Sequence, residues 1–268
     1  MTPSQRMVLF DSMAVSDLMQ LASSSSLLKE LTNIYKDMVW RVDDFLATWF
    51  YASLKFRCIL GFTGAIVSGS QVIRFLDRME PAISSDLDIL TRVGGVLSLV
   101  NYLEDEGYTR VQRKPGRKED YPLLADVCAL SSTTQFCKGG GKHGIVEIFD
   151  FEKKLGRTLQ GVDRLKVQVV VVVQNPIQHI LFSYHSTAVM NYICHDETVS
   201  IFPKPTFEKR VSYPSTRVDL GDDWNPAWKA KYEARGFRFD LESLDPELIL
   251  GKRFVKDRYC WVLPHEGE

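Results

Sequence analysis

The sequence predicts a mixed α/β protein, and three of its features indicate this class. Apolar residues recur at helical spacing in the first 56 residues, the middle alternates short β-branched runs with helical segments, and the last third mixes both patterns. The chain has 268 residues, 45% hydrophobic and 25% charged, which is typical of a globular protein with its own core. We therefore expect a mixed sheet with helical additions.

The chain divides into three predicted segments. Residues 1–56 form a helical N-terminal segment, residues 57–175 form the mixed-sheet core, and residues 176–268 form a C-terminal α/β extension packed on the core. Ser16 or Asp17 is a suitable N-cap for one N-terminal helix and Ser26 for the next, which carries Ile34 and Met38 in its apolar stripe.

Hydrophobic periodicity and turn residues predict the elements of the core and the extension. Strands are predicted at 65–67, 86–90, 108–113, 144–151, 166–173 and 253–261, helices at 71–78, 96–106, 226–235 and from Pro176 onward, a hairpin at 192–202, and loop at 114–144.

Charge and apolar patterning restrict the surroundings in which the chain acts. The net charge is -1 and the pI about 6.5, which argues against bulk nucleic-acid binding. The longest apolar stretch, at residues 169–173, is too short to span a bilayer, and no signal peptide is evident. We expect an intracellular protein, cytoplasmic or nuclear, that does not associate with a membrane.

The five cysteines are odd in number and widely spaced. No CxxC pair occurs, and no Cys/His group has the spacing of a zinc site. Free thiols in a reducing compartment are the expected state. The cysteines are Cys58, Cys128, Cys137, Cys194 and Cys260.

Two aspartates, Asp86 and Asp88, lie where charged and apolar residues alternate. On a strand, residues two apart point to the same face. Paired carboxylates repel each other and gain most from a cation between them, and Mg²⁺ often bridges such groups to phosphates. We therefore expect Asp86 and Asp88 to hold a divalent cation; a solvated strand end is the plain alternative.

Gly69 and Ser70 stand between a predicted strand and a predicted helix. Glycine lets the backbone approach a phosphate, and the helix start offers free N–H groups to an anion. The order of strand, Gly-Ser, helix, Pro81 and a strand with D-x-D resembles the polymerase-β-like nucleotidyltransferase superfamily. Fifteen residues lie between Ser70 and Asp86, slightly more than the usual gap.

The resemblance implies both a chemistry and a set of ligands. Asp86 and Asp88 would hold Mg²⁺ or Mn²⁺, and Gly69 and Ser70 would bind the triphosphate of a nucleoside triphosphate (NTP). Two metal ions roughly 4 Å apart would stabilise the attacking and leaving oxygens. The nucleotidyl group would pass to an acceptor, either a small molecule, a protein or an RNA end.

The third carboxylate of the superfamily's metal site has no counterpart at the matching position. That position is Gln168 in the predicted strand at 166–173, and an amide offers an oxygen but no charge. Two alternatives follow. Either Glu147, on the preceding predicted strand, supplies the missing carboxylate, or the chain binds nucleotide without transferring it.

The whole chain is similar to a group of proteins from basidiomycete fungi. In that group Gln at the third position is usual, and the N-terminal helices resemble an F-box, a helical bundle that docks a ubiquitin-ligase adaptor. The resemblance implies a protein partner at these helices; helices that only pack on the core are the alternative. The matching stretches are VSDL at 15–18, IVSGS at 66–70, SDLD at 85–88, KVQV at 166–169 and HSTAVMN at 185–191.

Several further groups allow a functional and a structural interpretation. His185 and Asn191 form a wall of the nucleotide pocket or belong to a capped turn. The loop at 138–142 contacts phosphates or is a hairpin tip. Basic residues near 204–210 contact phosphates or solvent, and the aromatic residues near 224–232 are core or a base-stacking platform. These residues are Lys204, Lys209, Arg210, Trp224, Trp228 and Tyr232.

Three function hypotheses follow from these features. The first is Mg²⁺-dependent nucleotidyl transfer by Asp86 and Asp88. The second, motivated by Gln168, is a catalytically weak nucleotide sensor or an interaction module. The third is an F-box-like adaptor that acts through the N-terminal helices.

Overall fold

A computed structural model describes residues 3–111, 127–129, 144–159, 161–215, 227–239 and 254–265 of the chain. Its strands are β1 (Ile66–Ser68), β2 (Leu87–Thr91), β3 (Thr109–Val111), β4 (Ile145–Leu159), β5 (Val162–Val172), β6 (Asn191–Ile193), β7 (Glu197–Ser200), β8 (Val211–Ser212), β9 (Arg238–Phe239) and β10 (Trp261–Pro264). Eight of them form one sheet in the order β10-β7-β6-β1-β2-β5-β4-β3, and β8 pairs with β9. Since β2 and β5 are parallel and the other neighbours in the large sheet antiparallel, the predicted mixed α/β class is confirmed.

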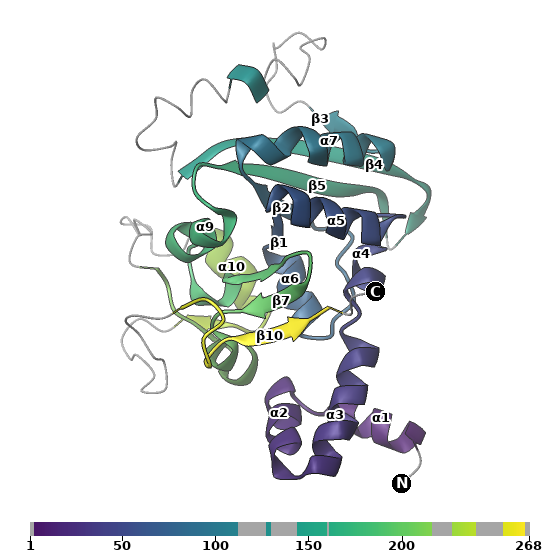
Figure 1. The fold of residues 1–268 in the computed structure, drawn as a ribbon, viewed down its shortest axis with the longest axis vertical. Helices are drawn as coiled ribbons and strands as arrows, with labels where there is room; N and C mark the ends of the chain where they lie inside the picture. Colours follow the sequence, from purple (N-terminus) through teal and green to yellow (C-terminus); the bar gives the residue numbers. More distant parts are fainter. Residues whose placement is uncertain are drawn as a thin grey trace.

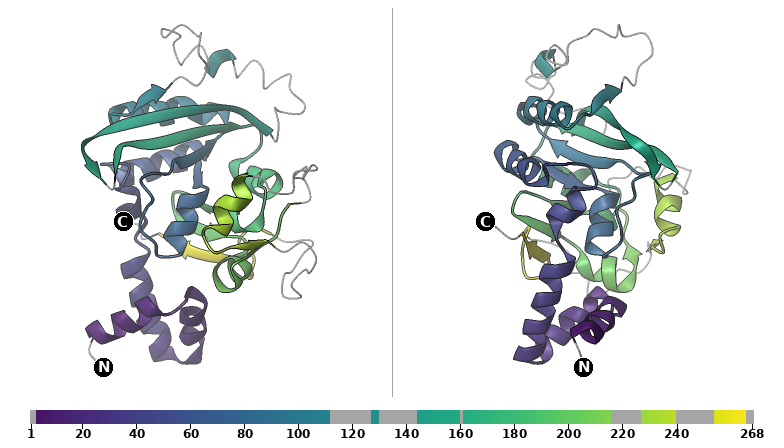
Figure 2. Two further views of the ribbon diagram at one scale, coloured as in Figure 1. Left: turned by 180° about the vertical axis from the view of Figure 1, so that it is seen from behind. Right: turned by 90° about the vertical axis from the view of Figure 1, so that its right-hand side faces the viewer.

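Helices cover both faces of this sheet. The α-helices of the described residues are α1 (Pro3–Ser12), α2 (Val15–Ser24), α3 (Ser26–Val39), α4 (Val42–Leu46), α5 (Ser53–Thr63), α6 (Ser70–Leu76), α7 (Val96–Asp105), α9 (Pro176–Ser183) and α10 (Ala227–Glu233). Helices α5 and α7 lie on one face and α10 lies on the other (Figures 1 and 2). The alternation of β2 and β5 produces these two faces, because Ile89 and Val169 belong to one buried cluster and Leu90 and Val170 to another.

The N-terminal helices α1, α2 and α3 project away from the large sheet but remain tied to it (Figure 1). Arg78, which follows α6, connects them to the core. It donates hydrogen bonds to the carbonyls of Phe10 and Met13 and to the hydroxyl of Tyr35. Trp40 adds a hydrogen bond from its indole N–H to the carbonyl of Leu76, at 3.2 Å. The segment therefore packs on the core, and a protein partner for it stays a prediction.

Two details of the N-terminal helices differ from the prediction. Ser25, not Ser26, caps α3, because its side chain accepts a hydrogen bond from the backbone N–H of Leu28. Ile34 and Met38, expected in the apolar stripe, are 50% and 56% exposed.

Several C-terminal strands join the large sheet. Strands β6, β7 and β10 extend it beyond β1, so residues 176–268 include part of the same layer as the core. The predicted hairpin at 192–202 is present as β6 and β7. The last strand, expected at 253–261, begins only at Trp261, because residues 254–260 form turns with hydrogen bonds such as Cys260 N–H to Asp257 O at 3.0 Å.

The β4–β5 hairpin is longer than predicted, since the strand expected at 144–151 continues to Leu159. The predicted loop at 138–142 and Trp224 lie outside the described residues. Among the residues that the structure describes, no helix is long and apolar enough to cross a membrane.

Candidate functional site

A row of polar side chains crosses four strands of the large sheet. Ser68 of β1 is paired with Asp88 of β2, Asp88 with Gln168 of β5, and Gln168 with Asp150 of β4. Residues paired directly across neighbouring strands lie on the same face of a sheet. The register therefore brings Asp88 and Gln168 together, as the sequence predicted, and adds Asp150 one strand further.

The turn between β1 and α6 is built around Gly69. Its φ of 80° and ψ of −155° lie in a region that only glycine adopts without strain. A Cβ atom at this position would also overlap Oδ2 of Asp88. The carboxylate of Asp88 thus packs directly over the turn, and Gly69 and Ser70 stand between strand and helix where the sequence placed them.

Gln71 of α6 fixes the loop that leads into the acidic pair. Its side-chain N–H₂ donates to the carbonyls of Ala82 and Ser85, at 2.8 and 3.2 Å, and its oxygen accepts from the N–H of Ala82 at 3.2 Å. The side chain is fully buried. Sequence reasoning did not find this role, because the loop's backbone partners depend on how it folds back onto α6.

The electrostatics of the site centre on Asp88. Burial of its carboxylate, together with the negative charge of Asp86, raises the pKa of Asp88 to about 7, and the positive charge of Lys231 opposes this shift. Buried carboxylates are usually neutralised by a partner, and perturbed pKa values of this kind are frequent at functional sites. Asp86, which immediately precedes β2, and Asp88 of the polar row are therefore the candidate ligands for a divalent cation.

Helix α10 borders the acidic pair from the side of the C-terminal segment. The exposed Lys231 lies close enough to influence the charges of both Asp88 and His185. Tyr232 of the same helix is buried, and burial raises its pKa to about 12, with the charge of Asp88 adding to the shift. The core interpretation of Tyr232 agrees with this burial, whereas the position of Lys231 was not foreseen.

His185 packs against α10. Its ring stacks on Trp228 with ring centroids 4.0 Å apart and an interplanar angle of 19°. Burial, with a contribution from Lys231, lowers the pKa of His185 to about 4, so the ring is neutral at pH 7. Its Nδ1 lies 2.9 Å from the hydroxyl of Ser186. These contacts favour a role in holding α10 beside the acidic pair.

Asn191, the first residue of β6, is hydrogen-bonded to Ser68 of the polar row. Its backbone carbonyl accepts a hydrogen bond from the hydroxyl of Ser68, and its side-chain N–H₂ donates to the carbonyl of Ala188, both at 2.7 Å. The residue is fully buried. Asn191 thus supports β1 and the short helical turn at Thr187–Val189, which agrees with the structural alternative.

Glu147 does not share the face of Asp88. It is paired with Val171, whose side chain belongs to the buried cluster on the opposite face, and its carboxylate accepts from the backbone N–H of Ile148 at 3.1 Å. The structure therefore does not bring Glu147 to the acidic pair. Asp150, which is paired with Gln168, is the β4 carboxylate that belongs to the polar row on the face of Asp88.

Arg210, one of the three basic residues considered for phosphate contacts, forms an ion pair with Asp77 at 2.7 Å. A cavity of about 260 Å³ lies elsewhere, between the N-terminal helices and β10, and none of the residues of the polar row lines it.

Comparisons of the chain with models of protein families, with curated proteins and with solved structures found no match.

The raised pKa of Asp88 predicts how stability depends on pH in a metal-free buffer. The folded-state pKa of about 7 lies above the ordinary value of 3.8, so the unfolded chain loses this proton first. Stability should therefore fall as pH rises from about 4 to about 7. Asp88→Asn removes the effect and should be more stable than the parent at pH 8 by up to about 4 kcal/mol, the free energy that corresponds to a pKa raised from 3.8 to about 7, with no difference near pH 4.

Urea unfolding at several pH values in the presence of a chelator measures this difference. Asp37→Asn, at an exposed position of α3, is the control and should follow the parent at each pH. Equal pH profiles for the parent and Asp88→Asn would show that the carboxylate is not desolvated.

Proposed function

We propose that the chain binds a nucleoside triphosphate together with Mg²⁺ or Mn²⁺ at Asp86 and Asp88 and transfers its nucleotidyl group to an acceptor. The observation that supports this most is the buried carboxylate of Asp88, packed over Gly69 and raised in pKa beside a second acid. A divalent cation is the ligand that such a pair would gain most from. The order of the elements, which resembles the nucleotidyltransferase superfamily, adds to this support.

Each residue of the site has a role in the proposed reaction. Asp86 and Asp88 would hold the cation, which supplies charge stabilisation at the phosphates. Gly69, with no side chain, lets the Asp88 carboxylate pack against the turn, and the backbone at Gly69 and Ser70 would contact the triphosphate. Lys231, which already opposes the raised pKa of Asp88, would pair with the negative charge of the triphosphate.

The reaction itself is a displacement at the α-phosphorus. A hydroxyl of the acceptor forms the new P–O bond and releases its proton to solvent, while the bond to the β-phosphate oxygen breaks and pyrophosphate leaves. The acceptor would approach from the side of β5 and β4, where Gln168 and Asp150 continue the row. Its identity as a small molecule, a protein or an RNA end is left open by this geometry.

Gln168 supports a second candidate function, a nucleotide-binding sensor without efficient transfer. It stands directly beside Asp88 and contributes no charge where the superfamily has a third acid. Binding would then depend on Asp86 and Asp88 alone. The two candidates share the binding site and differ in turnover.

The first test is transfer of label from each α-labelled triphosphate in Mg²⁺ or Mn²⁺, with pyrophosphate release as a second readout. Asp86→Ala/Asp88→Ala should reduce both by at least about 100-fold, since the cation loses its charged ligands. Asp17→Ala/Asp37→Ala removes two exposed acids and should leave both unchanged.

Nucleotide binding measured in the same samples separates the two candidate functions. Metal-dependent binding without transfer would select the sensor. Binding and transfer that are equal in the parent and in Asp86→Ala/Asp88→Ala would contradict both.

A second test concerns the third carboxylate. Gln168→Asp adds a charge beside Asp88 and should create or raise transfer activity, by about tenfold or more if the second cation is the limiting feature. Asp150→Asn should lower activity, because it removes the only other carboxylate of the paired row.

Glu147→Gln is the matched control, since Glu147 lies on the other face of the sheet. Label transfer at saturating nucleotide measures all three variants. Loss of activity in Glu147→Gln, with none in Asp150→Asn, would refute the assignment drawn from the strand register.

A further inference from the structure

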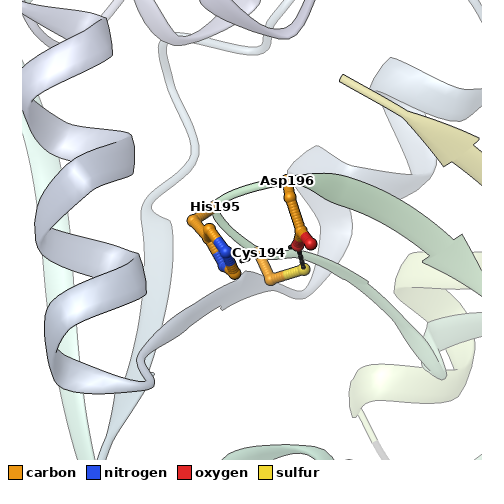
Figure 3. Close-up of side chains that lie close together, drawn as sticks. All are labelled: Cys194, His195 and Asp196. Carbon is orange, nitrogen blue, oxygen red and sulfur yellow. Dashed lines mark hydrogen bonds and ion pairs between the residues drawn. The ribbon is translucent and has the colours of Figure 1, made fainter. Parts of the chain in front are cut away.

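The turn between β6 and β7 brings together three side chains that are typical metal ligands. Cys194, His195 and Asp196 are consecutive residues, and one ligand atom from each lies within 4.8 Å of the other two. Figure 3 shows the thiol, imidazole and carboxylate on the same side of the turn, directed toward one another. Consecutive residues of an extended strand would point in alternating directions, so the turn itself creates this cluster.

Hydrogen bonds from three parts of the chain fix the backbone of this turn. The N–H of Cys194 donates to the carbonyl of Glu197 at 2.9 Å and closes the hairpin. Nε of Arg57, from α5, donates to the carbonyl of His195 at 2.9 Å, and the N–H of His265 donates to the carbonyl of Asp196 at 2.8 Å. The carbonyl of each ligand residue except Cys194 is thus held by an element outside the hairpin.

The His195 ring is also positioned by packing. It lies so close to Gly61 of α5 that a Cβ atom there would be 3.2 Å from the ring. Arg57, which holds the His195 carbonyl, is itself paired with Asp43 at 2.6 Å. Ligand positions that are set by packing and by outer hydrogen bonds require little rearrangement when a metal binds.

Two of the three separations between ligand atoms are close to the edges of a tetrahedral site, and the third, between Cys194 and His195, is within 4.8 Å. Sγ of Cys194 lies 3.2 Å from Oδ1 of Asp196, and Nδ1 of His195 lies 3.3 Å from the same oxygen. Zinc bond lengths of about 2.3 Å to sulfur and about 2.0 Å to nitrogen or oxygen give tetrahedral edges of about 3.5 and about 3.3 Å. A cation could therefore take up its place with shifts of a few tenths of an ångström in these two edges.

We propose that Cys194, His195 and Asp196 bind a zinc-type divalent cation with three protein ligands and a fourth position open to solvent. A thiolate and an imidazole select Zn²⁺ and similar borderline cations over Mg²⁺, which takes oxygen ligands. His195 and Asp196 are exposed, so water or a substrate atom can reach the fourth position.

The surrounding charges permit a cation in this turn. The charge of Lys256 acts on Asp196, but Lys256 is paired with Glu197 at 2.5 Å. Arg57, which binds the carbonyl of His195, is paired with Asp43. Both of these cations are thus engaged by a carboxylate.

A reactive free cysteine is the main alternative for this cluster, and the surroundings of the thiol argue against it. Cys194 is only partly exposed, and its thiol donates hydrogen bonds to Oδ1 of Asp196 at 3.2 Å and to the carbonyl of Glu197 at 3.3 Å. Activated cysteines lie instead beside positive charges or a helix N-terminus that stabilise the thiolate. On metal binding, a cation would take the place of the proton that now lies between Sγ of Cys194 and Oδ1 of Asp196.

This site is separate from the acidic pair and independent of the proposed nucleotidyl transfer. Asp88 is paired with Ser68, the last residue of β1. Ile193 of β6 is paired with Val67, and β6 runs antiparallel to β1, so the turn that follows Ile193 lies beside the first residue of β1. The two sites thus lie toward opposite ends of β1 and differ in the class of cation that they suit.

Titration of the full-length, metal-free protein with Co²⁺ tests the proposal, because a cobalt–thiolate bond gives a charge-transfer absorption band that oxygen ligands do not. The band should saturate at one Co²⁺ per chain and disappear when Zn²⁺ is added. Cys194→Ser should abolish the band and weaken Zn²⁺ binding, measured by competition with a chelator, by roughly 100-fold, since even an outer-shell partner is worth about 10- to 100-fold.

Further variants keep the outcome decisive if one of them folds poorly. His195→Gln and Asp196→Asn should each retain the fold by circular dichroism and weaken Zn²⁺ binding by at least about tenfold. Cys128→Ser, which removes an exposed thiol outside the cluster, and Asp86→Ala/Asp88→Ala should keep the band. Absence of a charge-transfer band in the folded parent, or Zn²⁺ binding by Cys194→Ser equal to that of the parent, would overturn the proposal.

Discussion

The contact between the Asp88 carboxylate and the backbone of Gly69 is the constraint on which the rest of this structure depends. No side chain fits at position 69, because a Cβ atom would overlap Oδ2 of Asp88 and the φ of 80° favours glycine. The contact coincides with the pairing of Ser68 and Asp88, which aligns β1 with β2, and Gln71 holds the preceding loop in place. Burial of an ionised carboxylate lowers the stability of the folded chain unless a partner neutralises its charge.

The proposed cation, held together with the triphosphate, would be that partner. In the protein alone, Asp86 adds to the unfavourable charge at Asp88, and the positive charge of Lys231 offsets only part of it, leaving the pKa near 7. Gln168 beside Asp88 limits the negative charge of the site to the pair itself and to Asp150 one strand away. Under the proposed function, Asp86 and Asp88 would account for nucleotide binding, and the uncharged Gln168 beside them would limit the efficiency of transfer.

The sequence predicts best what depends on near neighbours. The Gly-Ser turn is a local pattern and lies between a strand and a helix, as expected. The strand expected at 86–90 begins at Leu87, so Asp88 lies on it and Asp86 immediately precedes it. The outer part of the β4–β5 hairpin was missed because charged residues interrupt the apolar pattern, although Glu152 and Arg164 pair across the strands at 2.8 Å. Asp150, Gln71 and Lys231 join the site through strand register and helix packing, which periodicity does not encode. The Cys194 cluster escaped the spacing rules for zinc sites, since those rules describe separated ligands rather than one turn.

The central claim is that Asp86 and Asp88 hold a cation that bridges to a nucleotide over Gly69. A crystal structure of the protein with Mn²⁺ and a non-hydrolysable nucleoside triphosphate tests it most directly, because Mn²⁺ is located by its anomalous scattering. The account predicts an anomalous peak within bonding distance of both carboxylates, with triphosphate oxygens on the same ion and the phosphates beside Gly69. A nucleotide bound elsewhere, or an acidic pair without a peak at saturating Mn²⁺ and nucleotide, would contradict it.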